Sequence, residues 1–199
     1  MAAQIGILAL QGDFDAHRSA VERAGARAKE VRTAADLQDI DGLIIPGGES
    51  TTMLKLIDLE ELFEPIRSFG ASKPIFGTCA GAILLASEVI HPCQVSLGLM
   101  DLTVERNGYG RQIDSRIAQI DLDGGTQEAV FIRAPIIRRV GPDAKVLASY
   151  AGAPVLVEQG NHMAATFHPE LSSGSQIHRY FIEKVASVRA ENHVSSGTL

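Results

Sequence analysis

The sequence predicts an α/β protein of the flavodoxin-like type: a doubly wound sheet in three layers, mostly parallel, with an antiparallel extension. In the first half of the chain, short apolar runs alternate with stretches of helical periodicity, which is the pattern of parallel strands joined by crossover helices. Between Val95 and Gln159, short apolar runs follow one another without long helical stretches, which is typical of antiparallel strands.

The first half of the chain opens with the apolar run Ile5–Leu10, which predicts a buried strand, and Gln11-Gly12 then predicts a turn. Apolar residues at helical spacing predict a helix over Asp13–Ala24, with Asp13 as a candidate N-cap. His17 falls within this pattern, and we expect it to belong to the helix without a catalytic role. A single helix is predicted from Ser50 to Phe69. Further strands are predicted at Ala28–Val31, Gly42–Ile45 and Pro74–Phe76.

The second half of the chain contributes short strands and one closing helix. Strands are predicted at Leu102–Val104, Ile117–Leu122, Val130–Ile132, Val146–Ser149, Pro154–Glu158 and Met163–Phe167. The closing helix is predicted over Gly174–Ala190, and the polar segment Glu191–Leu199 is expected to be frayed or disordered. Because no internal repeat occurs, a single domain over residues 1–190 is predicted.

The composition excludes several classes of function. The chain has 199 residues, of which 45% are apolar and 21% charged, as in an ordinary globular domain. A net charge of −6 argues against a nucleic-acid partner, and no apolar run approaches the roughly 20 residues of a membrane span. No basic stretch opens the chain, and only two cysteines occur, so neither a signal peptide nor a disulfide framework is predicted. A cytoplasmic location is therefore expected.

The pentapeptide Gly77-Thr78-Cys79-Ala80-Gly81 joins the strand at Pro74–Phe76 to a helix-forming run from Ala80 to Glu88. Such a strand–turn–helix elbow lifts a nucleophile out of the sheet. It also points the Ala80 N–H and the positive end of the helix dipole toward the group that the sulfur attacks. A buried structural cysteine would equally satisfy the pentapeptide, so the motif alone does not decide between the two.

The second candidate motif is His168-Pro169-Glu170, which follows the apolar run Met163–Phe167. A cysteine nucleophile needs a base, and the base needs an orienting group. In an extended segment His168 and Glu170 project from the same side, so the carboxylate can fix the imidazole tautomer. Ligands bind beyond the carboxyl ends of the strands in open α/β sheets, which is where both motifs are predicted to lie.

Glycine-rich pieces do not predict a nucleotide or flavin site. The loop Gly47-Gly48-Glu49-Ser50 precedes a helix and could hold an anion, but it lacks the spacing and the lysine of a Walker A loop. Gly6, Gly12 and Gly25 do not form a dinucleotide-binding fingerprint. The six histidines are scattered, so no metal site is predicted, and no cofactor is expected.

Taken together, the cysteine elbow and His168-Pro169-Glu170 resemble the class I, triad-type glutamine amidotransferases, and within them the family of glutaminase subunits of pyridoxal 5'-phosphate synthase. Many relatives in the class carry a Gly-Gly-Pro-Gly type loop. Here Glu49-Ser50 replaces the end of that loop, and this difference favours the narrower family. The resemblance extends from near residue 5 to near residue 185. The distinguishing segments are Leu10-Gln11-Gly12, Pro46-Gly47-Gly48-Glu49-Ser50-Thr51-Thr52, Val104-Glu105-Arg106-Asn107, Gly110-Arg111-Gln112, Phe131-Ile132-Arg133-Ala134-Pro135 and Phe167-His168-Pro169-Glu170-Leu171.

The resemblance implies a hydrolase that converts L-glutamine to L-glutamate through a γ-glutamyl thioester and supplies ammonia to a synthase partner. It implies a triad in which Cys79 attacks, His168 moves the proton and Glu170 orients His168. The N–H groups of Gly48 and Ala80 would form the oxyanion hole. On the residues alone, Arg106 and Arg133 are better explained as solvated surface charges. The glutamine-binding positions implied are Gly48, Glu49, Ser50, Arg106, Ile132 and Arg133.

Three alternatives remain open on the sequence. One is an amidotransferase that serves a different ammonia acceptor. Another is a non-catalytic redox sensor or chaperone with one reactive cysteine, although such a role does not require His168 and Glu170 together. The last is a flavodoxin-like electron carrier, for which the phosphate-binding fingerprint is missing.

Overall fold

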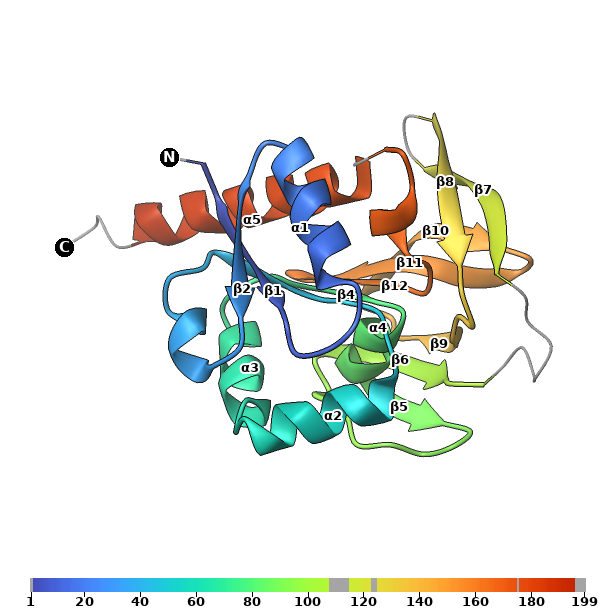
Figure 1. Ribbon diagram of the computed structural model, residues 1–199. Helices are drawn as coiled ribbons and strands as arrows, with labels where there is room; N and C mark the ends of the chain where they lie inside the picture. The colour runs from blue at the N-terminus through green and yellow to red at the C-terminus, as the bar shows by residue number, and fades with distance from the viewer. Residues whose placement is uncertain (1, 108–114, 123–124, 175, 196–199) are drawn as a thin grey trace.

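The computed structural model describes residues 2–107, 115–122, 125–174 and 176–195. Its centre is a seven-stranded sheet in the order β10-β11-β12-β4-β3-β1-β2 (Figure 1). The strands of this sheet are β1 (Gln4–Leu8), β2 (Arg27–Val31), β3 (Gly42–Ile45), β4 (Ile75–Thr78), β10 (Ala144–Tyr150), β11 (Ala153–Gln159) and β12 (His162–Ala165). Strands β12, β4, β3, β1 and β2 pair in parallel, whereas β10, β11 and β12 pair antiparallel. The predicted fold class, a mostly parallel sheet with an antiparallel extension, is confirmed.

Helices cover both faces of the sheet and make the structure three-layered (Figure 1). One face carries α1 (Phe14–Arg23) and α5 (Gln176–Ser195), and the other carries α2 (Ser50–Leu59), α3 (Phe63–Gly70) and α4 (Ala80–Leu85). Strand β3 shows why both faces are apolar. Leu43 and Ile45 pack with the α2–α4 side, while Ile44 packs with the α1–α5 side, because successive strand side chains alternate between faces.

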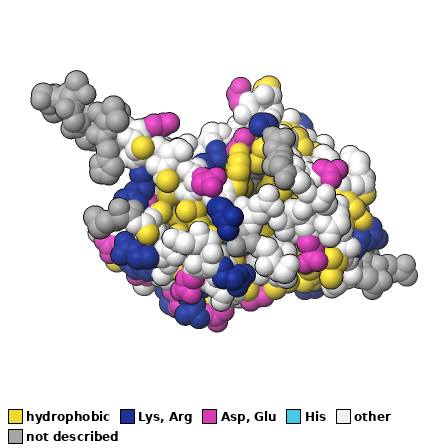
Figure 2. Space-filling view, turned by 90° about the horizontal axis from the view of Figure 1, so that it is seen from above, with side chains coloured by type: hydrophobic (Ala, Val, Ile, Leu, Met, Phe, Trp, Pro, Cys, Tyr) yellow, Lys and Arg dark blue, Asp and Glu magenta, His cyan; other side chains and the backbone are white. Residues whose placement is uncertain are grey.

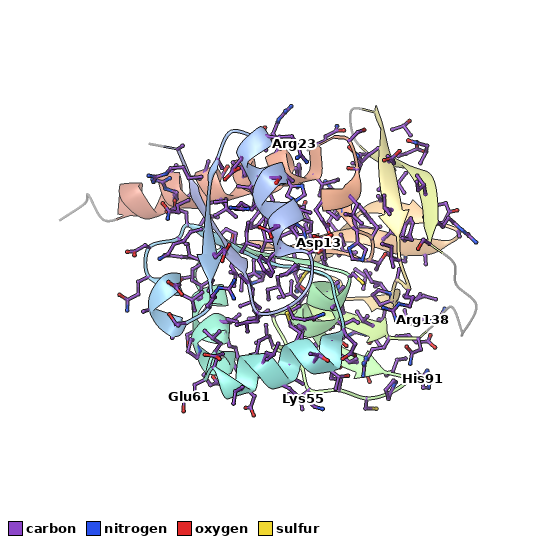
Figure 3. The ribbon with its side chains drawn as sticks, in the orientation of Figure 1. Asp13, Arg23, Lys55, Glu61, His91 and Arg138 are labelled. Atoms are coloured by element: carbon purple, nitrogen blue, oxygen red, sulfur yellow. The ribbon has the colours of Figure 1, made fainter. Side chains whose placement is uncertain are left out.

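Two small sheets lie beside the central one. Strands β5 (Ala86–Ile90), β6 (Met100–Glu105) and β9 (Ile136–Val140) form the first, and β7 (Arg116–Leu122) pairs with β8 (Gly125–Phe131) in a hairpin. Figure 3 labels His91, which follows β5, and Arg138 in β9, and both contact the carboxylate of Glu105 in the central strand β6. The predicted strands of this region occur close to the expected positions, but β5 and β9 were not predicted.

The helix predicted from Ser50 to Phe69 is in fact two helices, α2 and α3. The chain turns between them at Glu61, whose φ is +52°. The break is explained by Pro65, which would clash with the preceding turn inside a continuous helix but is tolerated in the first turn of α3. The turn also buries Leu62 completely.

The helix predicted to run to Glu88 ends at Leu85. Ala86 has an extended backbone, with φ −61° and ψ 150°, and begins strand β5, which pairs in parallel with β6. In β5, Ala86 and Val89 are buried while Ser87 and Glu88 are exposed. Parallel pairing with β6, a contact distant in sequence, therefore overrides the helix propensity of this run.

The start of α1 and the end of α5 differ slightly from the prediction. Asp13 occupies the N-cap position of α1, but its side chain makes no capping hydrogen bond. Helix α5 begins at Gln176 and continues to Ser195, so the segment expected to fray after Ala190 is helical for five more residues. Residues 196–199, like the motif Gly110-Arg111-Gln112, lie outside the described residues. No helix in the described ranges is both long enough and apolar enough to cross a membrane.

Candidate active site

The candidate site lies where the loops after four neighbouring parallel strands meet. Strands β1, β3, β4 and β12 end there and lead to Gln11-Gly12, Gly47-Gly48, Cys79 and His168. These loops border a cavity of about 240 Å³. Its lining residues are Gly48, Glu49, Ser50, Cys79, Ile83, Arg106, Asn107, Ile132, Arg133 and His168. The structure therefore brings together every implied glutamine-binding residue, with Glu170 and Ala80 placed behind the cavity wall.

Cys79 sits at the corner between β4 and α4 in a strained backbone conformation, with φ +49° and ψ −102°. The strain is held by the sheet, because Cys79 N donates a hydrogen bond to Ala165 O of the neighbouring strand at 2.8 Å. A Cβ atom on Gly81 would lie 2.1 Å from Ile45 O, so only glycine lets α4 approach the sheet this closely. Ala80, the first residue of α4, has one of the N–H groups without a partner inside the helix.

His168 follows β12 and is fixed from two sides. Its backbone N donates to Val130 O at 2.8 Å, and its Nδ1 lies 2.7 Å from Glu170 Oε1, with both side chains buried. Burial alone would lower the pKa of His168, but hydrogen bonds with Cys79 and Glu170 raise that pKa to about 10. The imidazole is therefore a cation at neutral pH, held against the Glu170 carboxylate.

The loop at Gly47-Gly48 packs tightly against His168 and Cys79 and against the loop after β1. A Cβ atom on Gly47 would lie 2.3 Å from His168 Cε1, and one on Gly12 would lie 1.8 Å from Gly47 O. Glu49 N donates to Gln11 Oε1 at 3.2 Å. The side chain of Gln11 thus supports the segment that carries the Gly48 N–H, which gives the Leu10-Gln11-Gly12 motif a structural role.

Glu49 and Arg106 form the charged wall of the cavity. The Glu49 carboxylate caps α2 by accepting from Thr51 N and Thr52 N. Burial would raise the pKa of Glu49, but the hydrogen bonds from Thr52 and Thr51 lower it to about 2. Arg106 Nη2 contacts Glu49 Oε1 at 3.2 Å and Thr51 Oγ1 at 2.8 Å. Arg106 is therefore not the solvated surface charge favoured on the residues alone, whereas Arg133, with φ +44°, is exposed at the cavity rim.

Four polar residues near the site have no site role assigned from the sequence. Asn107 lines the cavity, and Gln94 accepts a hydrogen bond from the Ser50 hydroxyl at 3.0 Å. His17 and His178 are completely buried behind the triad. A signal for His17 existed, because the predicted helix placed it on the same apolar face as Val21. His178 carries a comparable signal, because it lies three residues before Phe181 and seven before Val185 in the predicted closing helix, whereas no such signal marks Gln94.

The charge of the molecule outside this cavity is mixed. Figure 2 shows Lys and Arg side chains interspersed with Asp and Glu on the face seen from above. In the part of the chain that the structure describes, no three His, Cys, Asp or Glu side chains converge in an arrangement that could hold a metal ion.

Comparison with known proteins agrees with this geometry. Residues 7–187 match the sequence profile of the SNO glutamine amidotransferase family. The chain is 56% identical over 190 residues to the pyridoxal 5'-phosphate synthase subunit PdxT of Solibacter usitatus, covering 92% of this chain and 99% of the relative. It is 53% identical to the protein of the same name from Koribacter versatilis, covering 92% and 95% of the two chains. A crystal structure of a glutamine amidotransferase superposes with a TM-score of 0.87 at 46% identity, covering 92% of this chain and 98% of that one.

Proposed function

Because the chain belongs to the SNO glutamine amidotransferase family, we propose that it is a glutaminase subunit of pyridoxal 5'-phosphate synthase. It hydrolyses L-glutamine to L-glutamate and ammonia and supplies the ammonia to a synthase subunit. The observation that carries the catalytic assignment is the buried contact of 2.7 Å between His168 Nδ1 and Glu170 Oε1, directly behind the cysteine elbow. Surface histidines rarely have such a partner, whereas a general base requires one.

The reaction follows from the protonation states of the site. The Cys79 thiolate attacks the side-chain amide carbon of glutamine, and the imidazolium of His168 protonates the leaving ammonia. A γ-glutamyl thioester remains on Cys79. The now neutral His168 takes a proton from a water molecule, which attacks the thioester carbon and releases glutamate. Glu170 remains in contact with His168 Nδ1 and stabilises each imidazolium that forms.

The negative charge that develops on the amide oxygen needs fixed donors. The N–H groups of Gly48 and Ala80 belong to the two loops that flank the Cys79 thiol, and they are our candidates for the oxyanion hole. One such donor is worth about 3 to 4 kcal/mol of barrier in comparable sites. Support of the Gly48 segment by Gln11 favours this assignment, because preorganised donors stabilise the transition state without reorganising.

Recognition of glutamine uses the charged wall. The α-ammonium group needs an anionic or carbonyl partner, for which Glu49 and the Ile132 carbonyl are suited. The α-carboxylate needs a cation, for which Arg106 and Arg133 are suited. The Ser50 hydroxyl donates to Gln94, so its lone pairs remain free to accept a hydrogen bond from the substrate.

A cytoplasmic location is consistent with this function. Both cysteines are free, and Cys93 is exposed, as suits a reducing compartment. Free ammonia is lost to solvent, so hydrolysis is useful only when the synthase subunit is docked. We therefore expect weak turnover in the isolated chain and faster turnover in the complex, since docking near Gly48 can select one orientation of its peptide.

The test is steady-state ammonia release from glutamine by the purified chain, alone and with an equimolar synthase subunit, with Cys79→Ala as the inactive control. Release that depends on Cys79 supports the glutaminase. No release in either condition, with complex formation shown by gel filtration, would contradict it. Equal turnover in both conditions would refute gating by the partner while leaving the hydrolase assignment intact.

A further inference from the structure

A buried histidine pair lies directly behind the catalytic carboxylate. His17, in α1, has Nε2 at 3.2 Å from Glu170 Oε2 and at 3.1 Å from Thr78 Oγ1. Its other ring nitrogen, Nδ1, lies 2.9 Å from Nε2 of His178 in α5. His17 and His178 are both 0% exposed, and Figure 3 labels the N-cap Asp13 and the last residue Arg23 at the two ends of α1.

The contact between Glu170 and His17 determines which ring nitrogen of His17 carries the proton. Glu170 Oε1 is occupied by His168, whereas Oε2 is buried and receives no well-aligned hydrogen bond from the described residues. An anionic oxygen in this position is costly unless a donor faces it. At 3.2 Å, His17 Nε2 must carry the proton, because a lone pair there would repel Oε2. The Nε2–H is aligned with Thr78 Oγ1, and Oε2 lies beside it as an off-axis electrostatic partner.

The contact between His17 and His178 indicates the same tautomer of His17. If His17 is protonated on Nε2, its Nδ1 accepts, and His178 must donate from Nε2. His178 Nδ1, which is buried and has no hydrogen-bond partner among the described residues, is then only an unused lone pair. The opposite tautomers would leave a buried N–H without an acceptor at His178 Nδ1, which native structures rarely tolerate.

Neither histidine carries a charge in this arrangement. Burial, followed by the proximity of His178 and His168, lowers the pKa of His17 well below its usual value. Burial and the more distant Arg23 lower the pKa of His178 to about 4. A second cation beside His168 is thus avoided, and the two rings act only through directional hydrogen bonds.

We propose that His17 is a positioning residue of the catalytic machinery, holding the second carboxylate oxygen of Glu170 through its Nε2–H while His178 fixes its tautomer. This inference rests on the proposed glutaminase function, since it assigns Glu170 as the group that orients His168. A carboxylate held at both oxygens cannot rotate away from His168 Nδ1. The imidazole of His168, which faces Cys79, is therefore oriented by a series of contacts that runs from His178 through His17 and Glu170.

The tautomers can be tested without any assay of activity. Histidines labelled with ¹⁵N in the wild-type chain should show His17 and His178 as neutral rings protonated on Nε2 in long-range ¹H–¹⁵N spectra, with His168 doubly protonated. Protonation of His17 on Nδ1, or a charged His17 at neutral pH, would overturn the inference. Because this readout does not involve glutamine, it stands even if the proposed function fails.

Kinetics of the complex with the synthase subunit provide the second test. His17→Leu removes the donor and should lower kcat about 10- to 100-fold, as loss of an orienting partner does elsewhere, with little change in KM. His17→Gln keeps an N–H at a similar distance from the backbone and should stay within about 10-fold of wild type. The matched control is Val21→Ala, which creates a cavity on the same buried face of α1 and should leave kcat unchanged.

Equal losses of kcat in His17→Leu and Val21→Ala, or an unchanged kcat in His17→Leu, would show that His17 is only a packing residue. If His17→Leu does not fold, the tautomer measurement decides alone.

Discussion

The two sides of the active-site cavity hold their polar groups in different ways. On the triad side, His168 is 7% exposed, Glu170 4% and His17 not at all, and each has a partner that fixes its orientation. On the recognition side, the Glu49 side chain is 48% exposed, and Arg133 lies open at the rim. The buried histidines have strongly perturbed pKa values, whereas Glu49 and Arg133 on the recognition side remain accessible to solvent and Arg106 is only partly so.

This contrast reflects two different tasks. A proton-transferring group must have one tautomer and one position when the substrate arrives, and burial with directional partners provides both. A recognition group must exchange water for the charged ends of the substrate, which requires access. Substitutions on the triad side should therefore change kcat, and those on the recognition side should change KM.

The sharpest test of the triad side compares the two cysteines. A glutamine-analogue electrophile should acylate Cys79 alone, although Cys79 is buried and Cys93 is exposed, because Cys79 lines the cavity together with His168 and Cys93 does not. A generic alkylating reagent should in addition modify Cys93, because that thiol is exposed. Peptide mass spectrometry locates both adducts, and Cys93→Ser serves as the control. Labelling by the glutamine analogue mainly at Cys93 would refute the nucleophile assignment.

The next effect concerns the buried carboxylate. Glu170→Gln should keep the fold but reduce kcat by several orders of magnitude, as the corresponding change does in serine proteases, because an amide stabilises the imidazolium poorly. Since Glu170 is one of the groups that raise the pKa of His168 to about 10, its loss lets that pKa fall. The alkaline limb of the kcat/KM profile should then move to lower pH. Wild-type turnover in Glu170→Gln, together with an inactive His168→Ala, would redraw the triad as a dyad.

On the recognition side, Arg106→Gln should mainly raise KM. A hydrogen bond to a charged group is worth about 1.5 to 3 kcal/mol, which corresponds to a KM increase of roughly 10- to 100-fold. Arg138→Gln is the matched control, because Arg138 pairs with Glu105, the neighbour of Arg106, without lining the cavity. Initial rates over a range of glutamine concentrations separate KM from kcat. A loss confined to kcat would place Arg106 in the chemistry and remove the contrast between the two sides.

Much of the parallel core could be predicted from the sequence, because each of its elements has a local pattern. The strands at Gly42–Ile45 and Pro74–Phe76 are apolar runs bounded by glycine or proline, and their predicted bounds lie close to those of β3 and β4. The failures arose where a local pattern was overruled. Pro65 divides the long helix in the sequence itself, whereas the strand at Ala86–Ile90 exists only because a distant partner strand pairs with it.

The site divides along the same line. The implied lining residues lie in motifs only a few residues long, so a family resemblance carried by the sequence alone is enough to assign them. The support behind the triad could not be assigned in this way, because His17 and His178 are 161 residues apart and meet only through the packing of α1 beside α5. Sequence motifs therefore sufficed to name the proposed reacting groups, while the histidines packed behind them meet only in the tertiary fold.

The smallest expected effect separates stability from recognition at Glu49. Its carboxylate caps α2, and the pKa of about 2 lies below the ordinary 4.5, so its stabilising contribution is present above pH 4.5 and is lost as the pH falls toward 2. Glu49→Gln should lower the free energy of unfolding near neutral pH by about 1 kcal/mol or less, given the exposure of the side chain, and the difference from wild type should vanish in acid. Glu60→Gln, at the opposite end of the same helix, is the control and should be neutral or slightly stabilising, since a negative charge is unfavourable at a helix C-terminus. Urea unfolding followed by circular dichroism at several pH values measures all three chains. If the free energy of unfolding of Glu49→Gln is lower than that of wild type by the same amount at every pH, the loss comes from packing and not from the charged cap. Glu49 on the recognition side would then be held by packing, as the residues on the triad side are.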